Sequence, residues 1–352
     1  MNNRFLIDYD NPDAGIGHSM GIINRAIKIA SRNHLQFAYS EDQLRKSNDA
    51  DWRWRLKQGL RKLRGKKTDE SHNIGNDLNR LLNLKDLLLS REDLEKRIRS
   101  GEIKLIDLPQ FEIHIPSNEQ LDHEIYRSVD QFIQSHPEPN TAFRIRNNRF
   151  GDYEYASSKK WFANAYQQAR KQYPIPLLYD PKKLNIAVHI RRGDLLPGRQ
   201  FSELSTRMLP DAWYLEILDI VTSNASKPVA IYIFSEGRDG QYYSECGTPF
   251  SWKSHFRNSS FEVHEHIDDD FLSTFHHLIH ADILIGSKSG MSHLAGTLNH
   301  HIKIMPKMWH SYRGIDNLLV LPDSTEGLDH GAISAHIENR SRLADQIARP
   351  KP

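Results

Sequence analysis

A short apolar run that ends abruptly in charge, at residues 184–194, most constrains how this chain can fold. Its sequence is LNIAVHIRRGD, and residues 185–189 predict a short buried strand because apolar side chains lie together there and charged ones follow. Arg191, Arg192 and Asp194 therefore lie just past the end of a strand. Ligands of open α/β sheets bind beyond the carboxyl ends of the strands, so the pattern predicts a binding site here, in an α/β domain.

Two adjacent arginines at the end of a strand have two interpretations. A guanidinium is always charged, and its planar fork of donors fits phosphate oxygens in pairs, which favours an anion-binding role for Arg191 and Arg192. The alternative is a structural ion pair with Asp194 or with another acid in a domain interface. The charge pattern alone favours neither interpretation over the other.

The segment HIRRGD resembles the H-x-R-R-G-D signature of the fucosyltransferase superfamily, which covers the α1,2-, α1,6- and protein O-fucosyltransferases. The resemblance implies a GT-B architecture of two Rossmann-like domains facing a cleft, GDP-fucose as the donor substrate, inversion at the anomeric carbon and no metal ion. It also implies that Arg191 holds the donor's β-phosphate, with His189 and Arg192 in the same nucleotide site. Asp194 is expected to lock the arginine turn.

A second motif, at residues 281–296, supports a site of the same kind. A strand, a turn of small hydroxyl residues and a helix follow one another, and the backbone N–H groups and helix dipole of such a turn favour phosphate. The motif resembles the A-D-x-L-x-x-S-x-S segment that closes the fucosyltransferase donor site, and also the S-G-x-x-H-L-A segment of heptosyltransferase-like GT-B enzymes. A plain βα turn with a serine cap is the alternative. The predicted donor contacts here are Ser287, Lys288, Ser289, Gly290, Met291 and Ser292.

The segment VAIYIF at residues 229–234 predicts another buried strand, which ends in Ser235 and Glu236. This end resembles the F-S-[DE] segment found at the same point in fucosyltransferases, beside the nucleotide. The resemblance implies that both residues contribute to the donor site.

Three consecutive aspartates at residues 268–270 invite comparison with the D-x-D metal motif of the other glycosyltransferase class. They stand directly before a helical pattern at residues 271–280, where acidic side chains cap a helix and complement its dipole, so we favour capping. His276, His277 and His280 include the i, i+4 spacing of metal ligands, but the segment HHLIH lacks the glutamate of a zinc protease motif. Packing or solvent contact is the favoured interpretation, and no metal site is predicted.

The N-terminal residues predict a strand, a glycine-rich turn, a helix and a second strand, which together form a βαβ unit. The expected strands are residues 5–9 and 35–39, and apolar residues recur at helical spacing over residues 20–31. A dinucleotide fingerprint needs the pattern G-x-G-x-x-G, whereas Gly21 lies one residue too far beyond Gly17. This spacing argues against a nucleotide-binding dehydrogenase built on the turn.

Fucosyltransferase-like families carry a comparable Gly-x-Gly turn at this place, in the acceptor-binding domain and facing the cleft. The resemblance implies that Gly15 and Gly17 border the substrate site and that His18 points into it. The alternative is that His18 neighbours a helix N-cap and has no chemical role.

Residues 51–100 form an insertion that the resemblance covers least. Residues 51–67 are rich in lysine and arginine, with tryptophan and leucine between them, a composition suited to an anionic membrane or an acidic polymer. A solvated helix face is the favoured alternative, since most charge runs are solvent-exposed. Leucines recur at helical spacing over residues 78–98, and this second pattern ends at Gly101.

A proline-rich stretch at residues 173–176 marks the predicted boundary between two domains. We expect an acceptor-binding domain at residues 1–175 and a nucleotide-sugar donor domain at residues 176–331. In GT-B proteins the last helix crosses back to the N-terminal domain, and the helical pattern within residues 332–352 is expected to do the same.

Inverting glycosyl transfer needs a group that stabilises the departing diphosphate and a base that takes the proton of the acceptor hydroxyl. Arg191 meets the first need in this prediction. The candidates for the base are Glu203, His18 and Asp194. Glu203 lies in a loop predicted at residues 195–209, which is long enough to act as a lid.

Composition bounds the remaining classes of function. A net charge of +2 creates no global field for nucleic acid, and a hydrophobic content of 38% fits a globular enzyme. Cys246 is the single cysteine, so no internal disulfide is expected. The N-terminal sequence has no signal-like apolar region and no long apolar run follows, so we expect a cytoplasmic enzyme, with peripheral membrane contact at most, through residues 51–67.

The expected partners are a nucleotide-sugar donor and a glycan acceptor. The main alternative is a GT-B transferase that uses another nucleotide sugar, such as a heptose donor; a non-catalytic nucleotide-binding protein is a weaker one. An adhesion protein that displays the tripeptide at residues 192–194 would need an exposed loop, whereas here the tripeptide ends a predicted buried strand, so we disfavour that class.

Overall fold

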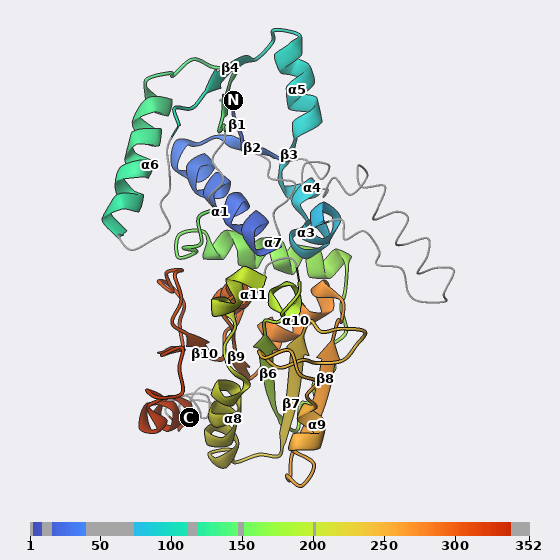
Figure 1. Cartoon of the computed structure of the whole chain (residues 1–352). Coiled ribbons are helices and arrows are strands. Elements are labelled where there is room, and N and C mark those ends of the chain that lie inside the picture. The colour runs from blue at the N-terminus through green and yellow to red at the C-terminus, as the bar shows by residue number, and fades with distance from the viewer. Residues whose placement is uncertain are drawn as a thin grey trace, which may run out of the picture. The chain divides into compact units, whose positions relative to one another are not determined.

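The computed structural model divides into two compact units (Figure 1). Unit 1 comprises Met1–Pro174 with Trp309–Ser311, and unit 2 comprises Ile175–Met308 with Tyr312–Pro352. The division after Pro174 lies next to the boundary predicted after residue 175. The structure describes residues 3–8, 16–39, 74–110, 119–146, 151–199 and 202–338.

Unit 1 is built on a parallel sheet of five strands in the order β3-β2-β1-β5-β4. From β1 the chain moves to β2 on one side, whereas β5 lies on the other side, so the strand order reverses between β1 and β5. All four residues of β1 are buried, as expected for a central strand. The strands are β1 (Arg4–Ile7), β2 (Gln36–Tyr39), β3 (Leu89–Ser90), β4 (Lys104–Asp107) and β5 (Thr141–Arg144).

The first helix of unit 1 starts earlier in the chain than the sequence pattern predicted. α1 begins at Ile16, so Gly17 and His18 lie in its first turn rather than in the glycine-rich turn that was predicted. α7 begins at Lys159. The helices are α1 (Ile16–Asn33), α3 (Ile74–Leu82), α4 (Leu84–Leu87), α5 (Arg91–Arg99), α6 (Glu119–Gln134) and α7 (Lys159–Gln172).

The single helical pattern predicted over residues 78–98 is wrong, because the chain breaks there twice. Asn83 adopts a left-handed conformation with φ of 52°, which ends the turn before it. The chain then pairs with β2 as the short strand β3, and Ser90 starts α5 by accepting a hydrogen bond from the Asp93 amide. Edge pairing with the sheet therefore overrides the leucine spacing.

Gly21 permits a close backbone contact rather than a nucleotide site. The amide of Asp152 donates to the Gly21 carbonyl at 2.9 Å. A Cβ on Gly21 would lie 3.1 Å from the Gly151 Cα and 2.6 Å from the Tyr153 ring. The helix can carry this neighbouring segment only because no side chain stands between them. The close contact with residues 151–153 thus explains the glycine at position 21.

Unit 2 is built on a parallel sheet of six strands in the order β11-β10-β9-β6-β7-β8. The segment predicted as a buried strand is confirmed as β6, which is central and buried in every residue after Leu184. The strands are β6 (Leu184–Ile190), β7 (Val229–Ser235), β8 (Glu262–Ile267), β9 (Ile283–Ile285), β10 (Ile302–Pro306) and β11 (Leu318–Leu321). Two Rossmann-like parallel α/β units are present, which is the fold class that the resemblance implies.

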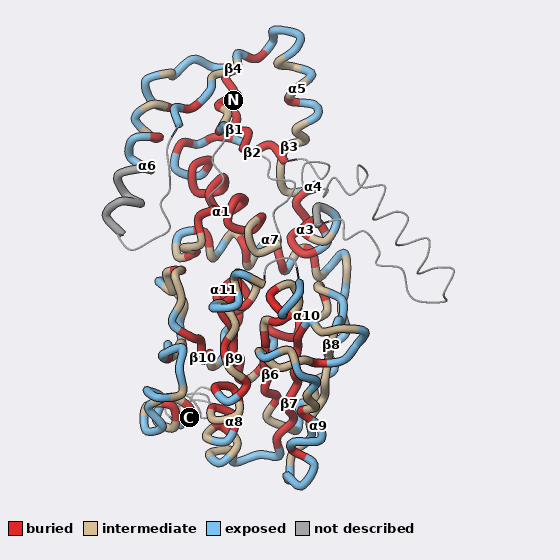
Figure 2. Tube along the Cα trace, in the orientation of Figure 1, coloured by how far each residue is buried: buried red, intermediate tan, exposed pale blue. Residues whose placement is uncertain are grey.

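Helices and short turns connect these strands. The hydrophobic core of unit 2 lies along its sheet (Figure 2). Trp213 and Trp252 are the largest fully buried side chains of the chain's described part. The predicted lid loop at 195–209 contains the 3₁₀ turn η4 (Ser202–Arg207) and begins within η3 (Gly193–Leu195). The helices are α8 (Asp211–Ser223), α9 (Trp252–His255), α10 (Phe271–His280) and α11 (Gly290–Leu298).

The last described residues, 331–338, are helical. Ile333 and Ile337 from this helix belong to the hydrophobic core of unit 2, together with Trp213 and Val221 of α8. The residues after 338 lie outside the described part, so the return of this helix to the N-terminal domain stays a prediction.

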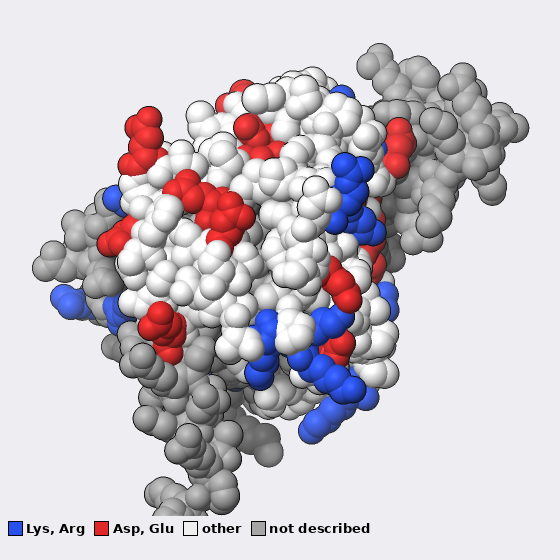
Figure 3. Space-filling view, turned by 90° about the horizontal axis from the view of Figure 1, so that it is seen from below, with Lys and Arg blue, Asp and Glu red and all other residues white. Residues whose placement is uncertain are grey.

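No helix in the described ranges combines the length and the apolar character that crossing a membrane requires. The basic residues 51–67, predicted to touch a membrane at most peripherally, lie outside those ranges. On the face drawn in Figure 3, acidic and basic side chains lie next to one another at the lower right, whereas several acidic side chains stand among uncharged surface toward the left.

Candidate nucleotide site at the carboxyl end of the second sheet

The two sequence motifs meet at one point of the unit 2 sheet. From β6 the chain proceeds to β7 on one side, whereas β9 pairs with β6 on the other, so the strand order reverses between β6 and β9. Arg191 follows β6 directly, and the serine turn at residues 287–289 follows β9. Ligands of open α/β sheets bind at such a switch point, at the carboxyl ends of the strands.

A buried polar cluster joins the two motifs. The His189 Nδ1 atom lies 2.5 Å from the Ser292 hydroxyl and 3.2 Å from the Ser287 hydroxyl. The Ser287 amide donates to the Ser292 hydroxyl at 3.0 Å. Burial, with a smaller effect of the nearby Arg191 charge, lowers the pKa of His189 to about 3, so its imidazole is neutral at physiological pH.

This cluster corrects the predicted roles of three residues. Ser287, Ser292 and His189 were expected to contact the donor, but each is at most 7% exposed and their polar groups bond to one another. A hydroxyl satisfied inside the protein would have to break that bond to reach a phosphate. The cluster instead ties the end of β6 to the turn after β9.

Arg192 is the second correction, since the predicted nucleotide contact is wholly buried. Its Nη2 atom lies 2.5 Å from the Asp211 carboxylate and 3.5 Å from the Glu245 carboxylate. Its side chain has 0% of its surface exposed. The structural ion pair, one of the two interpretations of the arginine pair, therefore applies to Arg192, and its acids lie at positions 211 and 245 rather than at 194.

Arg191 differs from its neighbour in that its side chain is 28% exposed. Its Nη2 atom lies 3.2 Å from the Asp194 carboxylate, which is itself 34% exposed. The predicted contact of Asp194 with the arginine turn is thus present. Because both groups stay partly open to solvent, the guanidinium keeps donors that an anion can use.

Gly193 makes the turn between these charges feasible. Its φ is 44°, a conformation that side chains rarely adopt, and a Cβ there would meet the Glu236 Oε2 atom at 1.8 Å. The Gly193 amide also faces the Glu236 carbonyl at 3.4 Å. Glycine at this position therefore brings the ends of β6 and β7 together.

Ser235 and Glu236, predicted beside the nucleotide, have different environments. The Ser235 hydroxyl donates to the Ile190 carbonyl at 2.8 Å and is buried, so it joins the strand ends. Glu236 is exposed at the edge of the same turn. Only Glu236 of this pair presents a side chain to solvent.

The turn after β9 ends in a capped helix. Ser289 is the N-cap of α11, and its hydroxyl accepts a hydrogen bond from the Met291 amide. Gly290 and Met291 form the first turn of this helix and are partly exposed. Lys288 is paired with the Asp323 carboxylate, and its hydrogen bond lowers the pKa of that carboxyl below the usual range.

A turn at residues 237–241, which sequence patterns did not indicate, holds the loop after the arginine motif. Arg238 donates to the Pro197 carbonyl at 2.8 Å. The Asp268 carboxylate accepts from the amides of Gly237 at 2.7 Å and Gly240 at 3.0 Å. Asp268 lies 31 positions from Gly237, and no local pattern marks a contact at that separation.

The other acids and histidines of this region take structural roles. Asp270 caps α10, as predicted, by accepting from the Ser273 amide. His277 is buried, and its Nε2 atom accepts a hydrogen bond from the Leu178 amide at 3.0 Å. Across the described ranges, no group of three or more His, Cys, Asp or Glu side chains is arranged to hold a metal ion.

The remaining predicted site residues are Gly15, Gly17, His18 and Glu203. Gly15 lies outside the described residues, and Gly17 is helical. His18 belongs to unit 1, and its Nδ1 atom lies 2.8 Å from the Tyr153 hydroxyl. Glu203 is exposed on η4.

No family model and no curated protein matches the chain. Solved structures do match, with low sequence identity. The chain is similar to POFUT1 in complex with GDP-fucose, at 11% identity and a TM-score of 0.43, over 85% of this chain and 94% of that one. It is similar to the Escherichia coli heptosyltransferase WaaC with ADP, at 12% identity and a TM-score of 0.41, over 96% and 99%.

A third match is the iron-containing dodecameric glycosyltransferase TibC from enterotoxigenic E. coli H10407, at 10% identity and a TM-score of 0.40, over 97% of this chain and 77% of that one. All three TM-scores are below 0.5, so the assignment of a function depends on the residues of this chain.

Proposed function

We propose that the chain is an inverting, metal-independent glycosyltransferase that transfers fucose from GDP-fucose to a glycan or glycoconjugate acceptor. The observation that carries the proposal is the position of Arg191. A partly exposed guanidinium directly follows the central strand of unit 2, at the point where the strand order reverses. The HIRRGD resemblance supports GDP-fucose as the donor.

The donor diphosphate, in this proposal, binds between Arg191 and the start of α11. The guanidinium supplies a fork of charged donors, and the N-terminal turn of a helix of nine residues supplies a positive dipole end. Lys288 is the next cation along this edge, and an incoming diphosphate competes with Asp323 for its ammonium group. Together these groups favour a ligand with two adjacent negative charges.

The same groups suit the transfer reaction. The bond between the anomeric carbon and the diphosphate oxygen breaks, and the acceptor oxygen forms a new bond from the opposite face. Negative charge grows on the departing diphosphate, where Arg191 stabilises it without a metal ion. Since the carboxylate of Asp194 already pairs with Arg191, the exposed Glu203 is the better candidate in unit 2 for the base that takes the acceptor proton.

Calorimetric titration of the full chain with GDP, UDP and ADP tests the donor half, with magnesium and with EDTA. We expect GDP to bind most tightly and equally well in both buffers. Arg191→Ala should weaken binding about 100-fold and leave the melting temperature unchanged. Arg199→Ala is the matched control, because this exposed arginine lies in the loop after the motif.

Preference for ADP or UDP would keep a nucleotide-sugar transferase and discard fucose. Binding that required magnesium would contradict metal independence. Failure of all three nucleotides to bind would overturn the proposal. Release of GDP from GDP-fucose, compared with release of ADP from ADP-heptose, then measures donor turnover by slow hydrolysis without any knowledge of the acceptor.

A further inference from the structure

Arg192 is a buried charge that touches the backbone of the exposed arginine before it. Burying a guanidinium costs several kcal/mol unless the charge is paired and its donors are bonded. Besides its ion pairs with the carboxylates of Asp211 and Glu245, the group donates from Nη1 to the Arg191 carbonyl at 3.0 Å. The charged network therefore ends on the residue whose side chain lies in the candidate site.

Tyr242 extends the network on its other side. The Tyr242 hydroxyl donates to the Asp211 carboxylate, and the Arg192 guanidinium lies 5.7 Å from the centre of the Tyr242 ring. The Asp211 amide donates to the Glu245 carboxylate at 3.0 Å. Tyr242 is 2% exposed, so this side of the network is shielded from water.

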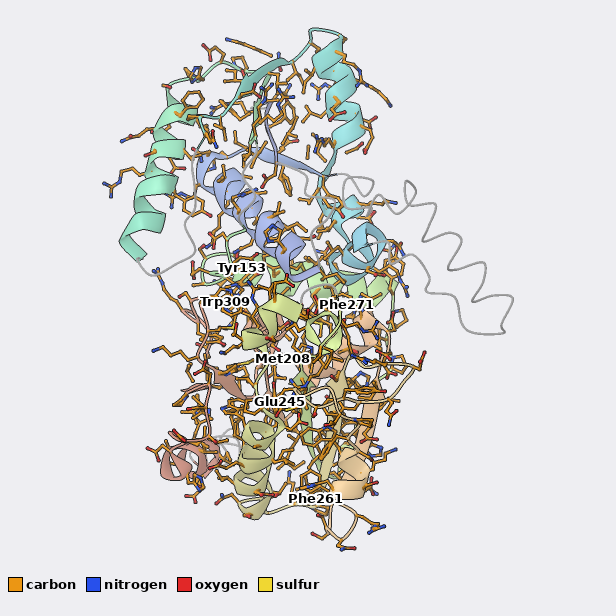
Figure 4. All side chains as sticks on the ribbon, in the orientation of Figure 1. Tyr153, Met208, Glu245, Phe261, Phe271 and Trp309 are labelled. Carbon is orange, nitrogen blue, oxygen red and sulfur yellow. The ribbon has the colours of Figure 1, made fainter. Side chains whose placement is uncertain are left out.

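Three separate segments thus meet in this network. Asp211 is the first residue of α8, Glu245 lies in the loop after β7, and Arg192 follows β6 (Figure 4 labels Glu245). Gly193, next in the chain, holds a positive φ and contacts Glu236, so the turn is fixed on the far side of Arg192 too. A turn held at this many points keeps one orientation of the side chain that it carries.

We propose that Arg192 is a positioning residue, which with Asp211, Tyr242 and Glu245 fixes the backbone so that the Arg191 guanidinium meets the donor diphosphate. The inference rests on the proposed function for the identity of the ligand. It assigns opposite tasks to two adjacent residues of the same type: Arg191 touches the nucleotide, and Arg192 acts only through Arg191.

A merely structural ion pair predicts a different result. Such a pair would stabilise unit 2, and its loss would lower the melting temperature while the folded protein kept its affinity for nucleotide. A positioning pair predicts that affinity falls in protein that is still folded. It also predicts that the loss disappears once Arg191 itself has been removed, because nothing is left to position.

The experiment is a double-variant cycle on the full chain, with GDP as the probe. Arg192→Lys keeps the charge but lacks the fork that reaches Asp211 and the Arg191 carbonyl together, so we expect about a ten-fold loss of GDP affinity at a temperature where the protein is folded. Combined with Arg191→Ala, the same substitution should cause no further loss. Tyr242→Phe removes one hydroxyl only and should cause a smaller loss of GDP affinity. This variant tests the proposal if Arg192→Lys does not fold.

Asn185→Ala is the control for a purely structural effect. Asn185 is 4% exposed at the opposite end of β6 and bonds to Asp180 and Asp282, so its loss destabilises the same sheet. It should lower the melting temperature and leave GDP affinity unchanged.

Equal GDP affinity of wild type, Arg192→Lys and Tyr242→Phe would overturn the positioning role while leaving the proposed function intact. A loss from Arg192→Lys that persists in full on top of Arg191→Ala would also overturn it. If wild type bound none of GDP, UDP and ADP, the proposed function itself would fail and take the inference with it.

Discussion

The two sheets of this protein end in opposite ways at their central strands. In unit 1, Asp8 follows β1 and is buried in an ion pair with Arg25 of α1 at 2.6 Å. In unit 2, the residue after β6 is Arg191, whose side chain stays 28% exposed beside an Asp194 side chain that is 34% exposed. The buried ion pair leaves no net charge to attract an anion, whereas an exposed guanidinium attracts one.

A charge at a strand end therefore indicates a binding site only when it is not already buried in an ion pair. Two parallel sheets of similar design offer the same kind of carboxyl edge, and they differ in what the helix after the central strand contributes. α1 brings an arginine that neutralises Asp8. We therefore expect a nucleotide diphosphate at the edge of unit 2 and not at β1.

Arg25→Ala should have the largest effect, and on stability alone. It leaves the Asp8 carboxylate buried beside the space of its lost partner, which costs about 3–5 kcal/mol. Urea unfolding measures the loss. Arg32→Ala, on the exposed side of the same helix and paired with Asp130, is the control and should cost less than about 1 kcal/mol. A similar cost for both variants would break the contrast between the units.

Gly193→Ala should follow, with a destabilisation of about 2–3 kcal/mol. The substituent meets both a positive φ and the Glu236 side chain at 1.8 Å. Gly198→Ala is a matched control, because its φ of 75° is also positive but nothing lies within 4 Å of the added Cβ. It should cost about 1 kcal/mol. Equal costs would show that the contact between the strand ends contributes nothing.

Acidification should destabilise unit 2 through His189. An unfolded histidine titrates near pH 6.5, whereas the folded pKa is about 3, so only the unfolded state binds the proton between these values. The contribution of His189 to the free energy of unfolding is therefore fully present above pH 6.5. It is lost as pH falls toward 3, by at most about 1.4 kcal/mol per pH unit. Urea midpoints at pH 7 and pH 5 for wild type and His189→Asn measure it, and the same pH dependence in both proteins would contradict this origin.

Asp323→Ala should have the smallest effect, and in the favourable direction. Its carboxylate is 53% exposed and competes with an anion for Lys288, and exposed ion pairs are worth about 0–1 kcal/mol. Removing it should raise GDP affinity about two- to five-fold by calorimetry. Asp239→Ala, an exposed acid in the turn after β7, serves as the control for general charge and should change affinity less. Weaker binding by Asp323→Ala would argue that Asp323 itself contacts the ligand.

Much of the fold follows from short-range patterns in the sequence. Continuous apolar runs predicted β6 and β7, and the aspartate before residue 271 predicted the start of α10. These features depend on neighbours within a few residues, so the chain encodes them locally. The break of the helical pattern near Asn83 was not predicted, because it depends on pairing with β2, some fifty positions earlier.

By itself, the sequence determined that an arginine pair ends a buried strand and that a serine turn ends another. Which of these side chains remain available to a ligand depends on packing between distant parts of the chain. Adjacent residues at a strand end face opposite sides. Arg192 is buried because it pairs with Asp211, 19 positions later, and with Glu245, which lies 34 positions after Asp211. Ser287 and Ser292 turn inward because His189, about a hundred residues away, completes their hydrogen bonds. Contacts between residues far apart in the sequence cannot be predicted from local spacing. Here such contacts bury Arg192 and leave Arg191 partly exposed.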